Sequence, residues 1–188
     1  NMMPYDGYTD REATAKKVVR NAFLTGDAWF RSGDLLRRDE DYFYYFVDRV
    51  GDTFRWKGEN VSTQEVAMVL DRTPGVSESN VYGVPIPGHE GRVGMAAIVL
   101  MPGQSFDGAA LYRVACELPA YARPLFVRLV PEMDVTGTLK QRKIELQRQG
   151  YDPHTISDPL YVRDDEAQAY VPLTEEAYRQ IISGERKL

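Results

Sequence analysis

The 188-residue sequence has few residues that bind metals or form disulfides, and it has no excess of positive charge. Its single cysteine, Cys116, cannot form an internal disulfide, and we interpret it as a small buried hydrophobic residue. The two histidines, His89 and His154, flank no cluster of Cys, Asp or Glu with metal-ligand spacing, so we expect no protein-ligated metal. A net charge of −5 argues against a nucleic-acid-binding surface.

Long apolar segments are also scarce. The longest, Val93–Met101, is about half as long as a bilayer-spanning helix. Residues 1–10 lack the basic-then-apolar order of a secretory signal and read like the middle of a loop, so we expect a fragment of a longer protein. With 43% hydrophobic and 27% charged residues, the composition is that of a soluble globular protein. We expect a cytoplasmic location, with peripheral contact at the inner face of a membrane as the alternative.

The first quarter of the sequence predicts one helix and one hairpin. A capping box at Thr9–Glu12, followed by a partly helical apolar pattern, predicts a helix that ends near Gly26. The aromatic-rich segment Asp34–Asp48 predicts two strands around a turn of charged residues.

The remaining sequence predicts helices that alternate with short strands. A second capping box, Ser62–Glu65, begins a helix that Pro74 and Gly75 end. The other expected elements are strands at Asn80–Val84, Val93–Leu100 and Leu125–Val130, and helices at Asp107–Leu118, at Lys140–Gln149 and from Thr174 to Gly184. This mixture predicts an α+β fold, in which helices flank a small antiparallel or mixed sheet and a helix and a β-hairpin precede it.

Three stretches carry residues suited to binding a nucleotide or another anion. Asp34 follows a glycine turn, where a carboxylate can accept both hydroxyls of a ribose or bond the local backbone. Arg49, Arg55 and Lys57 can form charge-assisted bonds to phosphates, or they can be the solvated face of a strand. Lys140 follows another glycine turn and can reach a phosphate or carboxylate, or it can belong to a basic helix face.

Several motifs occur in an order that resembles the C-terminal part of adenylate-forming enzymes: WFRSGDL, DRVGDTFRWKGENVSTQEV, EGRVGMAAIV, LPAYARPLFVR and TGTLKQRK. Within this superfamily they are similar to the very-long-chain acyl-CoA synthetases, the fatty acid transport protein family. The tail, YDPHTISDPLYV and YVPLTEEAYRQIISGERKL, resembles the C-terminal extension of that family. The resemblance implies a two-step reaction: a fatty acid and ATP form an acyl-adenylate with the help of Mg²⁺, and CoA then displaces AMP.

The resemblance also implies roles for single residues. Asp34 matches the aspartate that holds the ribose of the adenylate, and Arg49 matches an arginine that contacts the same sugar. Gly51, followed by Asp52, stands at the hinge between the two domains, where many superfamily members carry Asp or Lys. A glycine can still rotate there, but it offers no charged side chain to pin the hinge.

The later motifs match the residues of the two half-reactions. Arg55, Lys57 and Gly58 match a loop and strand that face the active site during thioester formation. Lys57 would attract phosphate, and Gly58 would allow close approach of the pantetheine. Lys140 is the expected adenylation lysine, which bridges the acid carboxylate and phosphate oxygens, with Lys143 as the alternative. Most of the superfamily has this lysine directly after the glycine.

The resemblance implies four segments in this chain. Residues 1–48 are expected to end the large AMP-binding domain, residues 49–52 to form the hinge, residues 53–150 to form the mobile C-terminal domain and residues 151–188 to form the extension. No phosphate-gripping loop and no acyl-tunnel region are present, so fatty acid, ATP and CoA would also need the missing N-terminal domain, and no nucleic acid is expected. The alternative is a stand-alone regulatory module that binds CoA, a nucleotide or a partner without catalysis.

Overall fold

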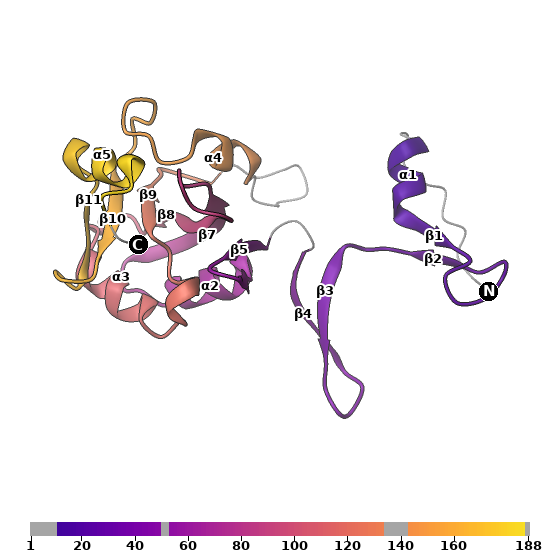
Figure 1. The fold of residues 1–188 in the computed structure, drawn as a ribbon. Helices are drawn as coiled ribbons and strands as arrows, with labels where there is room; N and C mark the ends of the chain where they lie inside the picture. Colours follow the sequence, from indigo (N-terminus) through magenta and orange to yellow (C-terminus); the bar gives the residue numbers. More distant parts are fainter. Residues whose placement is uncertain (1–10, 50–52, 134–142, 187–188) are drawn as a thin grey trace. The chain divides into compact units, whose positions relative to one another are not determined.

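The computed structural model describes residues 11–49, 53–133 and 143–186 (Figure 1). The chain divides into two compact units, Asn1–Val50 and Gly51–Leu188.

The first unit contains one helix and two small antiparallel sheets. Helix α1 (Arg11–Lys17) leads into strand β1 (Val18–Arg20), which pairs with β2 (Ala28–Phe30). The expected hairpin is confirmed as β3 (Asp34–Arg38) paired with β4 (Tyr44–Arg49). Its turn is closed by the Asp39 carboxylate, which accepts hydrogen bonds from the Phe43 amide at 2.9 Å and the Tyr45 hydroxyl at 2.8 Å.

The expectation that the first helix continues to Gly26 is wrong. The helix ends at Lys17, and the β-branched residues Val18 and Val19 instead pair with Phe30 and Trp29. Branching at Cβ disfavours a helix and suits a strand that has a partner. The turn between the two strands is held by the Asp27 carboxylate, which accepts three backbone N–H groups of residues 22–24 at 2.8–3.0 Å.

The second unit is built on a mixed five-stranded sheet, which confirms the expected α+β class. The strands lie in the order β11-β10-β9-β8-β7, and only the β8–β9 pair is parallel among the described strands. Their bounds are β7 (Val76–Val84), β8 (Val93–Leu100), β9 (Phe126–Leu129), β10 (Leu160–Asp164) and β11 (Ala169–Pro172). A separate hairpin, β5 (Phe54–Trp56) and β6 (Glu59–Val61), precedes the sheet in sequence.

Helices cover both faces of the sheet (Figure 1). One face carries α2 (Thr63–Leu70) and α3 (Gly108–Ala115), and the other carries α4 (Ile144–Gln149) and α5 (Glu175–Ser183). A one-turn 3-10 helix, Ala120–Ala122, precedes β9. Fully buried side chains between the layers include Leu70, Tyr82, Met95, Ile98, Leu111, Phe126 and Ile181.

Side-chain caps begin three of these helices, and the sequence predicts the one at Ser62. The Ser62 hydroxyl accepts the Glu65 amide of α2 at 3.2 Å, and the Thr174 hydroxyl accepts the Ala177 amide of α5 at 3.2 Å. Asp107 caps α3 through the amides of Ala109 and Ala110. Each cap satisfies an amide that has no partner within its helix.

The tail beyond Gly150 is part of the second unit rather than an appendage. Strand β10 pairs with β9, and β11 pairs with β10, although the sequence predicts neither strand. Apolar side chains of the tail join the core, namely Ile156, Leu160, Val162, Tyr170, Leu173 and Ile181. The change in composition at Gly150 therefore does not coincide with a break in the packing.

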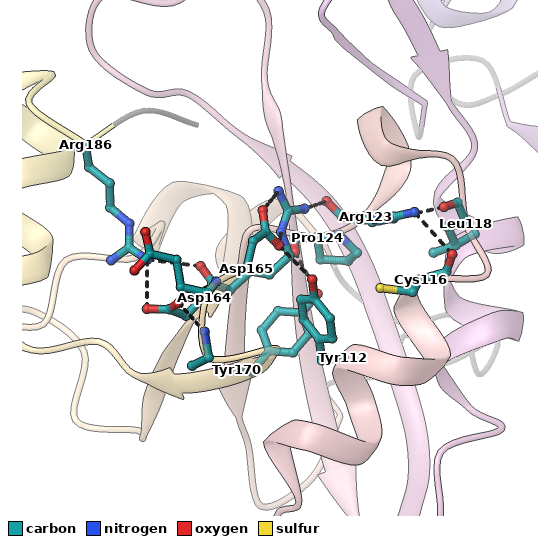
Figure 2. Close-up of polar contacts among 12 residues, drawn as sticks. Tyr112, Cys116, Leu118, Arg123, Pro124, Asp164, Asp165, Tyr170 and Arg186 are labelled. Carbon is teal, nitrogen blue, oxygen red and sulfur yellow. Dashed lines mark hydrogen bonds and ion pairs between the residues drawn. The ribbon is translucent and has the colours of Figure 1, made fainter.

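Polar contacts also bind the tail to α3 and to the segment that follows it (Figure 2). The Tyr170 hydroxyl donates to the Pro124 carbonyl at 2.7 Å, and the Tyr112 hydroxyl donates to Asp165 at 3.2 Å. The Arg123 guanidinium donates to the carbonyls of Leu118 and Cys116. Burial is the first cause of the raised pKa of Tyr112, and the Asp165 carboxylate raises it further.

Candidate functional site

The basic residues Arg55 and Lys57 lie on the exposed side of the β5–β6 hairpin. Phe54 and Trp56 alternate with Arg55 and are only 6% and 5% exposed, so the strand buries its aromatic side and presents Arg55 to solvent. The Arg55 Nε donates to the Gly58 carbonyl at 3.2 Å, which fixes the guanidinium over the turn. The two buried rings anchor this charged edge to the rest of the unit.

The turn of this hairpin consists of Lys57 and Gly58. Both residues have positive φ, 50° and 85°, which is the conformation of a two-residue turn that matches the twist of a hairpin. A Cβ at Gly58 would meet nothing within 4 Å, so the backbone is open on that side. The Lys57 ammonium lies 5.9 Å from the centre of the Trp56 ring. The open side of Gly58 is a backbone surface that a ligand can approach closely.

A second loop, residues 88–92, packs against the hairpin. The Arg92 amide donates to the Arg55 carbonyl at 2.7 Å, and the rings of His89 and Trp56 are 5.5 Å apart. Gly91 has φ +89°, and a Cβ there would collide with the Arg55 carbonyl oxygen. Only glycine fits this contact without strain.

The two loops carry four nitrogen-bearing side chains, which we call the hairpin patch: Arg55, Lys57, His89 and Arg92. All four residues are exposed. The same loops also carry Glu59 and Glu90. Sequence reasoning found Arg55, Lys57 and Gly58 but assigned no role to His89 or Arg92. The motif EGRVG, in which a glycine precedes an arginine, was the available signal for this loop. It does not reveal that the loop packs against the hairpin, because that contact joins residues far apart in the sequence.

The side chain of Lys143, the alternative for the adenylation lysine, is held by a hydrogen bond. Its ammonium donates to the Thr63 hydroxyl at 2.6 Å, and Thr63 is fully buried at the start of α2. Lys140 lies outside the described residues, as do the expected hinge residues Gly51 and Asp52. The choice of adenylation lysine therefore stays a prediction.

In the first unit, the two expected ribose-binding residues are cross-strand partners. Asp34 begins β3 and Arg49 ends β4, and the register pairs them directly. Ahead of Asp34, Gly33 has φ +86°, and the Ser32 hydroxyl accepts the Asp34 amide at 3.1 Å. The Lys17 ammonium donates to the Ser32 carbonyl at 3.0 Å, so the turn before Asp34 is held from α1.

A family comparison covers the middle of the chain. Residues 65–140 match the AMP-binding enzyme C-terminal domain. Outside this segment, the domain is preceded by the β5–β6 hairpin and followed by the tail that completes its sheet.

Curated relatives match this chain almost from end to end. It is 50% identical to long-chain fatty acid transport protein 6 of Mus musculus over 98% of this chain and 30% of the relative. It is also 50% identical to a medium/long-chain-fatty-acid–CoA ligase of Mycobacterium tuberculosis, over 98% of this chain and 31% of the relative. The chain thus spans about a third of the length of these relatives, and the family resemblance seen in the motifs is confirmed.

A solved structure gives the same fold for the AMP-binding C-terminal domain. O-succinylbenzoate coenzyme A synthetase from Bacillus subtilis, in complex with AMP, superposes with a TM-score of 0.62 at 28% identity. The match covers 78% of this chain and 28% of that protein. None of the described helices is long and apolar enough to cross a bilayer.

Proposed function

We propose that this chain is the C-terminal part of a fatty acyl-CoA synthetase that activates long- or very-long-chain fatty acids in two steps. The fatty acid and ATP form an acyl-adenylate and pyrophosphate, and the CoA thiol then displaces AMP. The observation that carries the proposal is the near-complete match, tail included, to a fatty acid transport protein and to a fatty-acid–CoA ligase.

Each group of site residues has one task in this reaction. Asp34 and Arg49 hold the ribose of the adenylate. They can act on the same sugar because they are cross-strand partners at one end of a hairpin. The hairpin patch attracts the phosphates of CoA through Arg55 and Lys57, while the open side of Gly58 admits the pantetheine. Lys140 stabilises the charge that develops between the carboxylate and the α-phosphate during adenylation.

The two units would rotate relative to each other between the steps, with Gly51 and Asp52 as the hinge. Mg²⁺ would accompany ATP, but no group of three or more His, Cys, Asp or Glu side chains in the described part of the chain is arranged to hold a metal ion. The proposal includes a cytoplasmic location beside a membrane, because long acyl chains partition into bilayers.

The test uses the full-length protein that contains this chain. AMP formation that requires both a long-chain fatty acid and ATP is expected for the wild type. Lys140→Ala is expected to lower acyl-adenylate formation about 100-fold or more, because a positioned charge is lost from the transition state. Transfer to CoA from a supplied acyl-adenylate should persist. If Lys143→Ala abolished adenylation while Lys140→Ala did not, the assignment of the lysine would be wrong.

A further inference from the structure

Helix α4 is attached to the sheet differently from the other helices of the second unit. Helices α2, α3 and α5 each bury at least one side chain completely or nearly so, whereas α4 has no buried residue. Its first residue, Ile144, is 80% exposed, and only Leu146 packs partly against the core. A six-residue helix with no fully buried side chain is unstable alone, so polar contacts help to hold it in place.

Those polar contacts grip both ends of α4. At its start, the Lys143 ammonium donates to the buried Thr63 hydroxyl at 2.6 Å. At its end, the Gln149 side-chain oxygen accepts a hydrogen bond from Arg128 Nη1 at 2.5 Å. Gln149 is oriented for this bond because its amide nitrogen donates to Glu145 one turn earlier, at 3.1 Å.

Arg128 is a rigid donor because the tail holds it. It lies on the central strand β9 and is 9% exposed, and its Nε and Nη2 contact Asp158 Oδ2 at 2.7 and 2.6 Å. Asp158 lies just before β10, beyond the segment that matches the AMP-binding C-terminal domain. A buried guanidinium needs such a counter-charge, and bonds from charged donors are among the stronger hydrogen bonds.

We propose that Asp158, Arg128 and Gln149 form a latch by which the tail positions α4 for the adenylation half-reaction. This inference rests on the proposed function. Three peptide units separate Lys143 from Lys140, so the Cα atom of Lys140 can lie no more than about 11 Å from that of Lys143. The three latch side chains are positioning residues: they set where that segment begins, and they contact no substrate.

The latch predicts an effect on one half-reaction only. A misplaced α4 impairs the step that uses Lys140, because a small displacement of a reacting group is costly. Transfer of the acyl group to CoA uses the hairpin patch, which has its own anchors, Phe54, Trp56 and Gly91. An ordinary folding defect would lower both steps.

The first test compares Gln149→Ala with the matched control Gln147→Ala in the full-length protein. Gln149→Ala removes the bond to α4 but leaves the Arg128–Asp158 pair intact, so no buried charge is exposed. Amide hydrogen exchange of residues 144–150 is expected to rise about tenfold in this variant. Acyl-adenylate formation is expected to fall about tenfold, while CoA transfer from supplied acyl-adenylate keeps its wild-type rate. Gln147→Ala should change none of these.

The second test compares two aspartates of the tail. Asp158→Asn is expected to reproduce the Gln149→Ala pattern more strongly, because Arg128 loses its counter-charge. Asp165→Asn is the control, since Asp165 bonds Tyr112 on the α3 side of the sheet. Asp158→Glu, which keeps the carboxylate, should restore part of the adenylation rate.

Three results would overturn the latch or its role. Unchanged exchange of residues 144–150 in Gln149→Ala and Asp158→Asn would show that no latch exists. Faster exchange with equal loss of both half-reactions, or with no loss, would remove the positioning role. If the wild type itself formed no acyl-adenylate, the proposed function and the positioning role would fall together, while hydrogen exchange would still decide whether the latch holds α4.

Discussion

At Gly108, α3 lies close against strand β11 of the tail, and substitution of this glycine gives a sharp test of that contact. A Cβ added there would overlap the Tyr170 carbonyl oxygen and lie 3.1 Å from the carbonyl carbon and 3.3 Å from the amide nitrogen. Because unstrained carbon contacts lie near 3.5–4.0 Å, the strand must move. These neighbours are backbone atoms of a paired strand, which cannot turn aside as a side chain does.

Two effects of opposite sign compete in Gly108→Ala. Alanine favours a helix over glycine by up to about 1 kcal/mol. Overpacking costs about 1–3 kcal/mol, and displacing Tyr170 threatens its buried hydrogen bond to Pro124, worth about 1 kcal/mol. We therefore expect a net loss of about 2 kcal/mol in the free energy of unfolding.

Urea unfolding followed by intrinsic fluorescence measures this free energy. The comparison variant is Ala109→Gly, one residue further along α3, which should lose no more than about 1 kcal/mol because it removes helix propensity without a collision. A Gly108→Ala protein as stable as the wild type, or more stable, would refute the close approach of α3 to β11.

Three further predictions concern the site, the pH profile and the tail. Lys57→Ala should raise the KM for CoA about two- to fivefold and leave acyl-adenylate formation unchanged, since the exposed ammonium acts only as a point charge; steady-state kinetics of both half-reactions check this. Burial raises the pKa of Tyr151 to about 12, so the stability that its neutral form contributes is complete below pH 10 and is lost between about pH 10 and 12. Tyr151→Phe should lose less stability than the wild type between pH 9 and pH 11, measured as the fall in the urea midpoint. An equal fall in both proteins would contradict the prediction. A chain ending at Gly150 should fail to fold its second unit, which circular dichroism and the soluble fraction would show.

Local signals in the sequence predicted much of the second unit. The Ser62 and Thr174 caps mark their helices because a hydroxyl that accepts an amide is a short-range event. Strand β8 was visible because its apolar run is bounded by glycine and charged residues. Strand β10 was missed because Arg163 and Asp164 interrupt its apolar pattern, and its pairing with β9 joins residues more than 30 positions apart.

The same distinction holds for the candidate site. The turn at Lys57 and Gly58 could be anticipated, since a glycine in a short basic segment favours a tight bend. The position of Gly91 against Arg55 and the bond from Arg128 to Gln149 could not, because both depend on how distant strands pack. Asp34 and Arg49 were each found by motif, but only the register of β3 and β4 makes them partners.

The place of β10 beside β9 has a consequence for the nascent chain. Strand β9 can pair with β8 once it leaves the ribosome, but β10 begins about 30 residues further along. At roughly 5–20 residues per second, translation of that stretch takes about 2–6 s. During this interval Phe126 and Val127 stay on an unpaired edge that can adhere to other strands. The speed at which the tail is synthesised therefore sets how long each new molecule is exposed to aggregation.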